Sequence, residues 1–118
     1  MDTIINNTEN YRKYQHNDLI YWIGKHAKGN TYIVTAAQQQ SMKKSYLWFH
    51  DDIESSAHLI VELDPDRLLS FEEKLYFASK INKSTKVCIT NVNNIKTTKI
   101  LGQVVIIKRH SVEIITIK

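Results

Sequence analysis

The chain has 118 residues, of which 42% are hydrophobic and 24% are charged, a balance typical of a soluble globular protein and unlike that of a disordered tail. This length fits a single domain over residues 1–118, and no apolar run approaches the ~18 residues that a membrane-spanning helix needs. The formal net charge is +4, and the one cysteine, Cys88, excludes an internal disulfide and a four-cysteine zinc site.

The first ten residues contain neither the basic nor the apolar segment of a secretory signal. We therefore expect a cytoplasmic protein with no membrane partner. A composition rich in Ile, Lys and Asn is typical of AT-rich coding DNA, which is compatible with a phage or another mobile element.

The first half of the chain predicts one helix followed by short strands. Thr8 can cap a helix over residues 8–27, in which aromatic and aliphatic residues recur every three to four positions. Residues 31–35 are β-branched and aromatic, which predicts a strand. Shorter apolar runs predict further strands over 46–49 and 57–63.

A turn and a second helix follow. Pro65 predicts the turn over residues 64–67, because proline presets the φ angle that the second turn position requires. Ser70 and Glu73 have the spacing of a capping box, in which each side chain accepts a hydrogen bond from a backbone N–H of the first turn. This pair predicts a helix over 70–80.

The last third predicts strands only. A strand is expected over 86–92, and the apolar segments 99–108 and 112–117 predict a hairpin that forms the centre of the sheet, because such apolar strands would aggregate at an edge. The order is therefore α-β-β-β-α-β-β-β. The predicted fold class is α+β, with two helices and a mainly antiparallel sheet of five to six strands.

Charge is unevenly distributed along the sequence. Residues 51–73 carry eight acids and one base, whereas residues 74–118 carry nine bases and one acid. A basic surface attracts phosphate polymers and an acidic one attracts basic proteins. Alternatively, the acidic block faces the basic third within one fold and cancels its field.

The basic C-terminal third favours nucleic acid, RNA or DNA, as the partner. Basic residues interleaved with aromatic ones are typical of surfaces that bind single strands, and residues 43–48 have this pattern, although aromatic pairs on a strand more often pack in a core. We therefore predict a small non-enzymatic protein associated with nucleic acid. The predicted contact residues are Lys43, Lys44, Tyr46, Trp48, Lys96, Lys99, Lys108 and Arg109.

The alternative is a protein-directed inhibitor, such as a toxin-immunity protein or a phage factor that blocks a host enzyme. The acidic residues Asp51, Asp52 and Glu54, or an aromatic surface, would then face the partner protein. The oligomeric state is not determined by either hypothesis.

Catalytic or metal-binding residues are scarce. If residues 51–58 were helical, Asp51, Glu54 and His58 would share a face and could bind a metal ion or transfer protons. The spacing matches no zinc motif, and an exposed acidic loop explains it better. His58 or His110 could serve a small metal-independent RNase. We expect no cofactor, no bound metal and no catalytic activity.

Overall fold

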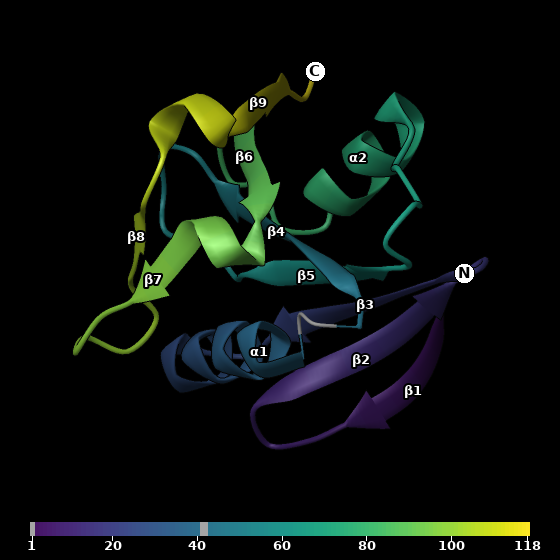
Figure 1. The fold of residues 1–118 in the computed structure, drawn as a ribbon, viewed down its shortest axis with the longest axis horizontal. Coiled ribbons are helices and arrows are strands. Elements are labelled where there is room, and N and C mark those ends of the chain that lie inside the picture. The colour runs from purple at the N-terminus through teal and green to yellow at the C-terminus, as the bar shows by residue number, and fades with distance from the viewer. Residues whose placement is uncertain (1, 41–42) are drawn as a thin grey trace.

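The computed structural model describes residues 2–40 and 43–118. They form an antiparallel sheet of seven strands, a separate two-stranded sheet and two α-helices, which confirms the α+β class and the antiparallel pairing (Figure 1). In spatial order the large sheet consists of β1 (Thr3–Asn7), β2 (Tyr11–His16), β3 (Leu19–Gly24), β5 (Leu59–Leu63), β4 (Ser45–Asp51), β6 (Lys86–Asn91) and β9 (Glu113–Thr116).

The other elements lie against this sheet. Helices α1 (Ala27–Gln40) and α2 (Phe71–Ala78) cover its two faces, and β7 (Ile95–Thr97) pairs with β8 (Val104–Ile106) in the small sheet. Short 3-10 helices, η1 (Val92–Asn94) and η2 (Arg109–Ser111), join β6 to β7 and β8 to β9. No helix of the described residues is long and apolar enough to cross a membrane.

The helix predicted over 8–27 is wrong, because this segment forms the strands β2 and β3. His16 pairs with Leu19, which leaves Asn17 and Asp18 in a two-residue hairpin turn, and Asn17 has a φ of 54°. Asparagine tolerates this left-handed conformation better than most residues. Apolar side chains of β3 pack on both faces of the sheet, and this double burial produced a spacing that resembled a helical pattern.

The strand predicted over 31–35 is also wrong, because these residues lie within α1. Gly29 and Asn30 belong to the first turn of α1. A Cβ atom at Gly29 would lie 1.9 Å from the carbonyl oxygen of Asn10, so only glycine permits this close approach. Packing against the sheet therefore overrides the local β propensity of the segment.

The predicted C-terminal hairpin does not form. β8 pairs with β7, whereas β9 pairs with β6 and is an edge strand of the large sheet, so the predicted central position is wrong. The central strand is β5. Strands predicted over 46–49, 57–63 and 86–92 are present as β4, β5 and β6.

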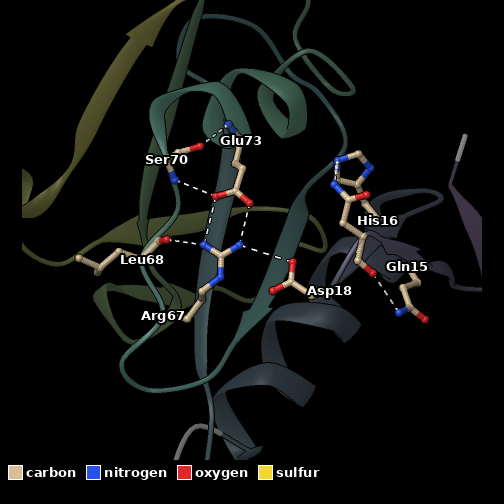
Figure 2. Close-up of polar contacts among 8 residues, drawn as sticks. Gln15, His16, Asp18, Arg67, Leu68, Ser70 and Glu73 are labelled. Atoms are coloured by element: carbon tan, nitrogen blue, oxygen red, sulfur yellow. Dashed lines mark hydrogen bonds and ion pairs between the residues drawn. The ribbon is translucent and has the colours of Figure 1, made fainter.

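The second predicted helix is confirmed as α2, with both hydrogen bonds of the capping box formed between Ser70 and Glu73. Figure 2 shows how Arg67 joins this box to the β2–β3 turn. The guanidinium donates to both carboxylate oxygens of Glu73 at 3.1 and 2.7 Å, and one of its nitrogens lies 3.6 Å from Asp18. The turn predicted before α2 is also present, since the backbone N–H of Arg67 donates to the carbonyl of Asp64.

Candidate functional site

The two aromatic residues of the predicted interface are buried. Tyr46 and Trp48 share one face of β4, but α1 and the small sheet cover that face and each side chain is only 2% exposed. Tyr46 packs against Trp22 with the ring centroids 5.8 Å apart. Neither residue presents a ring face on which a base could stack, so this part of the predicted surface is wrong. The reason is that β4 lies between β5 and β6, where both faces belong to a core.

The predicted basic residues fall into two separate groups. Lys43 and Lys44 precede the first residue of β4, where Lys43 is exposed and the Lys44 ammonium donates to Asp64 at 2.5 Å. The other four, Lys96, Lys99, Lys108 and Arg109, are exposed on or beside the small sheet. Among these six predicted basic residues, Arg109 alone lines the cleft that lies at the end of β4.

Asp51 is buried and joins two loops, so it is not available as a surface for a partner protein. Its carboxylate accepts hydrogen bonds from the backbone N–H groups of Ile53, Glu54, Lys83 and Ser84 at 2.6–2.9 Å, and from the Ser84 hydroxyl at 2.8 Å. Burial alone would raise the pKa of Asp51, but these amide hydrogen bonds hold the pKa well below its usual range.

The acidic segment after Asp51 is not helical, so Asp51, Glu54 and His58 do not share a helix face. Asp52 and Glu54 are exposed at the rim of the cleft. Within residues 2–40 and 43–118, no three His, Cys, Asp or Glu side chains are grouped so that they could hold a metal ion. The metal site considered for these residues therefore has no geometric support.

His58 is a buried, neutral residue. The Trp48 indole N–H donates to Nδ1 of His58 at 3.1 Å, so this nitrogen carries no proton. Burial lowers the pKa of His58 to about 3, and the neighbouring His50 acts in the same direction. With 1% of its surface exposed, His58 cannot serve as a general acid or base for an external substrate. His110 is exposed on η2, and nothing in the structure tests a catalytic role for it.

The first cleft has a volume of about 360 Å³ and lies between the end of β4 and the small sheet. The imidazole of His50 lies parallel to the Trp48 indole in this cleft, with the centroids 5.5 Å apart and 3° between the planes. Nδ1 of His50 is 2.6 Å from the carbonyl oxygen of Asp51. Because a carbonyl can only accept, Nδ1 carries the proton and Nε2 is left as an acceptor. Burial lowers the pKa of His50, which favours this neutral form.

Cys88 also lines this cleft and is paired across the strands with His50. Its thiol donates to the His50 carbonyl oxygen at 3.3 Å. Burial raises the pKa of Cys88 to about 11, so the thiol stays protonated at neutral pH and supplies no reactive thiolate.

The second cleft, of about 430 Å³, lies beside the first turn of α1. Lys25, His26 and Lys83 line it, and no carboxylate is among the described residues of its lining. His26 caps α1, because its Nδ1 accepts from the Gly29 N–H at 3.1 Å. The two clefts are adjacent, and the residues that line both are Ser55, Gly102 and Gln103.

No ion pair of the described residues joins the acidic block to the basic third, although Asp52 and Glu54 line the same cleft as Arg109. Within the acidic block, Asp64 pairs with Lys44 and Glu73 pairs with Arg67, while Asp51 is occupied by amides. Of the nine bases in 74–118, Lys74 pairs with Glu113 and Lys80 with Asp2. The rest form no ion pair with the described residues: Lys83, Lys86, Lys96, Lys99, Lys108, Arg109 and Lys118.

The sequence analysis did not identify three of the residues that line the clefts. Lys25 was placed in a predicted helix that the structure does not contain, and Lys83 lies in the loop after α2. His50 belongs to the polar segment that drew attention to His58, and its position two residues after Trp48 on a strand was the available signal that both rings share one face.

An antiparallel sheet covered by one helix on each face defines this as an α+β domain with a double cleft at the end of β4. No protein-family model matches the sequence, and no curated protein matches it either. Among solved structures, the fold is similar to the C-terminal part of the fibronectin/fibrinogen-binding protein of Streptococcus suis. The TM-score is 0.67 at 19% identity, and the match covers 97% of this chain and 48% of the other. The chain thus spans about half the length of that structure, and the similarity shows the fold alone.

Proposed function

We propose that this chain binds nucleic acid along the two adjacent clefts. The observation that carries the proposal is the placement there of cations that form no ion pair with the described residues, with Arg109 in the first cleft and Lys25 and Lys83 in the second. The Lys25 ammonium donates to the neutral Asn7 side chain at 2.6 Å, so its charge is not compensated there. When such cations bind a nucleic acid, they release the counterions condensed on its phosphates, and the affinity therefore falls as the salt concentration rises.

A polymer fits this arrangement better than one small anion. The cations occupy two clefts that meet at Gly102 and Gln103, so a bound chain would contact Arg109 in one cleft and the two lysines in the other. The exposed Lys99 follows β7 in the segment that leads to Gly102, and adds a further positive charge close to this junction. Attraction of this kind is independent of sequence, which is consistent with a chain of 13 lysines and only three arginines, because the planar arginine fork is the side chain better suited to reading base edges.

The test is fluorescence anisotropy of the full chain with a labelled 12-nucleotide single strand over a series of salt concentrations. The double variant Lys83→Ala/Arg109→Ala should bind about tenfold more weakly, and the slope of log affinity against log salt should fall by about 1.4, since each phosphate contact with a single strand contributes about 0.7.

The matched control is Arg12→Ala/Lys118→Ala, which removes the same charges from exposed positions outside both clefts. This variant should keep a slope close to that of the unchanged chain. Equal losses in the two variants would show that only net charge matters, and absence of binding at about 20 mM salt would rule out the nucleic-acid function.

Protein binding is the second candidate function. The structural relative is called a fibronectin/fibrinogen-binding protein, and this chain exposes two large apolar side chains next to one helix: Leu68 is 84% exposed and Phe71 is 60% exposed. Ile53, between Asp52 and Glu54 at the cleft rim, is 67% exposed. Affinity capture with and without nuclease separates the two functions, because a protein partner survives nuclease treatment.

A further inference from the structure

We propose that the first cleft receives one unpaired nucleobase, so that the preferred ligand is a single strand and not a duplex. This inference rests on the proposed function and adds to it the class of nucleic acid. The cleft that contains His50 and Arg109 carries it, because the groups there match the edge of a base as well as its phosphates.

His50 supplies a hydrogen-bond acceptor in a fixed orientation. Its ring is held on one side by the parallel Trp48 indole and at Nδ1 by the carbonyl oxygen of Asp51. Nε2 forms no hydrogen bond with the described residues and can accept from the amino or imino group of a base. In a Watson–Crick duplex those groups are already paired.

The rest of the lining combines donors with acceptors. Gln103 carries an amide that can do both, Asp52 can accept from an amino group, and Arg109 can stack on a base or bind its phosphate. The cleft volume of about 360 Å³ falls at the lower end of the ~300–1,000 Å³ of small-ligand sites. This size suits a single planar ring system, which must leave its stack in order to enter.

The cations outside this cleft fit the same ligand. The second cleft shares Gly102 and Gln103 with the first and offers Lys25 and Lys83 to the phosphates of adjoining nucleotides. A base in one cleft and its neighbouring phosphates in the other would give binding that depends on salt and on the presence of a base.

The experiment compares three labelled ligands of equal phosphate content by anisotropy: a 12-nucleotide single strand, the same length of strand with all its bases removed, and a duplex with 12 phosphates in total. We expect the single strand to bind about tenfold more tightly than either of the others, the magnitude of one base contact. Tryptophan emission should change with the single strand, because Trp48 lines the cleft.

The variant His50→Phe keeps a ring against Trp48 and removes the acceptor. It should reduce single-strand affinity to the level of the base-free strand, with an unchanged salt slope, while His110→Phe on the exposed η2 has no effect. If His50→Phe binds the base-free strand as tightly as the unchanged chain does, the variant is folded.

Four outcomes overturn the inference. Equal affinity for the three ligands, with a steep salt slope, leaves nucleic-acid binding in place and removes the base-binding cleft. Tighter binding of the duplex, or an unaltered preference for the single strand in His50→Phe, also removes it. Absence of binding to all three ligands overturns the proposed function together with this inference.

Discussion

Asp51 is the residue on which the local structure around the clefts depends most. Its carboxylate fixes the backbone of residues 53–54 on one side and of 83–84 on the other. These segments place Lys83 in the second cleft and Asp52 in the first. A negative charge that is only 2% exposed is tolerated because five donors replace its lost hydration.

We predict that Asp51→Asn lowers the free energy of unfolding by about 3 kcal/mol, because an amide nitrogen would replace one acceptor oxygen and leave buried N–H groups without a partner. Urea denaturation followed by circular dichroism measures this. The neighbouring Asp52→Asn, at an exposed position, should change stability by less than about 0.5 kcal/mol. Equal midpoints for the two variants would contradict the structural role of Asp51.

At the scale of elements, α2 and α1 form for different reasons. α2 carries its own start signal, the Ser70–Glu73 capping box, with acidic residues in its first turn that favour the helix dipole. α1 has no acidic residue in its first turn, and its segment has β propensity. It is helical because Ile33, Val34 and Ala37 are completely buried against the sheet.

We predict that Ser70→Ala lowers the free energy of unfolding by about 1 kcal/mol, the usual effect of removing an N-cap hydroxyl. The loss should appear in the midpoint of thermal or urea unfolding. Ser79→Ala at the other end of α2 is the control, since that hydroxyl only donates to the Leu75 carbonyl and caps no free N–H. A larger effect for Ser79→Ala than for Ser70→Ala would contradict this account of how α2 begins.

Across the whole molecule, several titratable groups are held in their neutral or ionised form by the fold. Burial keeps His58 neutral, with its pKa lowered to about 3. The ion pair with Arg67, supported by the Ser70 N–H, lowers the pKa of Glu73 to about 2. In both cases the unfolded chain takes up protons at a higher pH than the folded chain, so stability is lost as the pH falls.

We therefore predict that the urea midpoint decreases in two stages. The first stage begins near pH 6.5, where His58 would protonate only in the unfolded chain, and continues toward pH 3. The second begins near pH 4.5, where Glu73 gains a proton on unfolding. His58→Phe should reduce the change between pH 6.5 and 4.5, where the buried His50 still contributes, and leave the lower stage intact. A midpoint constant from pH 7 to 4 would contradict the buried neutral state of His58.

The elements that could be predicted from the sequence are those with a local cause. The capping box specified α2, Pro65 specified the turn before it, and short apolar runs specified β4, β5 and β6. The α+β class and the antiparallel sheet followed from these elements. In each case the signal lies within a few residues of the structure it produces.

Only the tertiary structure decided the N-terminal hairpin, α1, the pairing of β9 with β6 and the clefts. The sheet places segments around residues 25, 50, 83 and 109 side by side at one end, although they are far apart along the chain. Local propensities are worth a few tenths of a kcal/mol per residue, whereas burial of one large apolar side chain contributes about 1.5–3 kcal/mol. Long-range burial therefore overrode the local pattern, and it brought together the cations that the sequence had left dispersed.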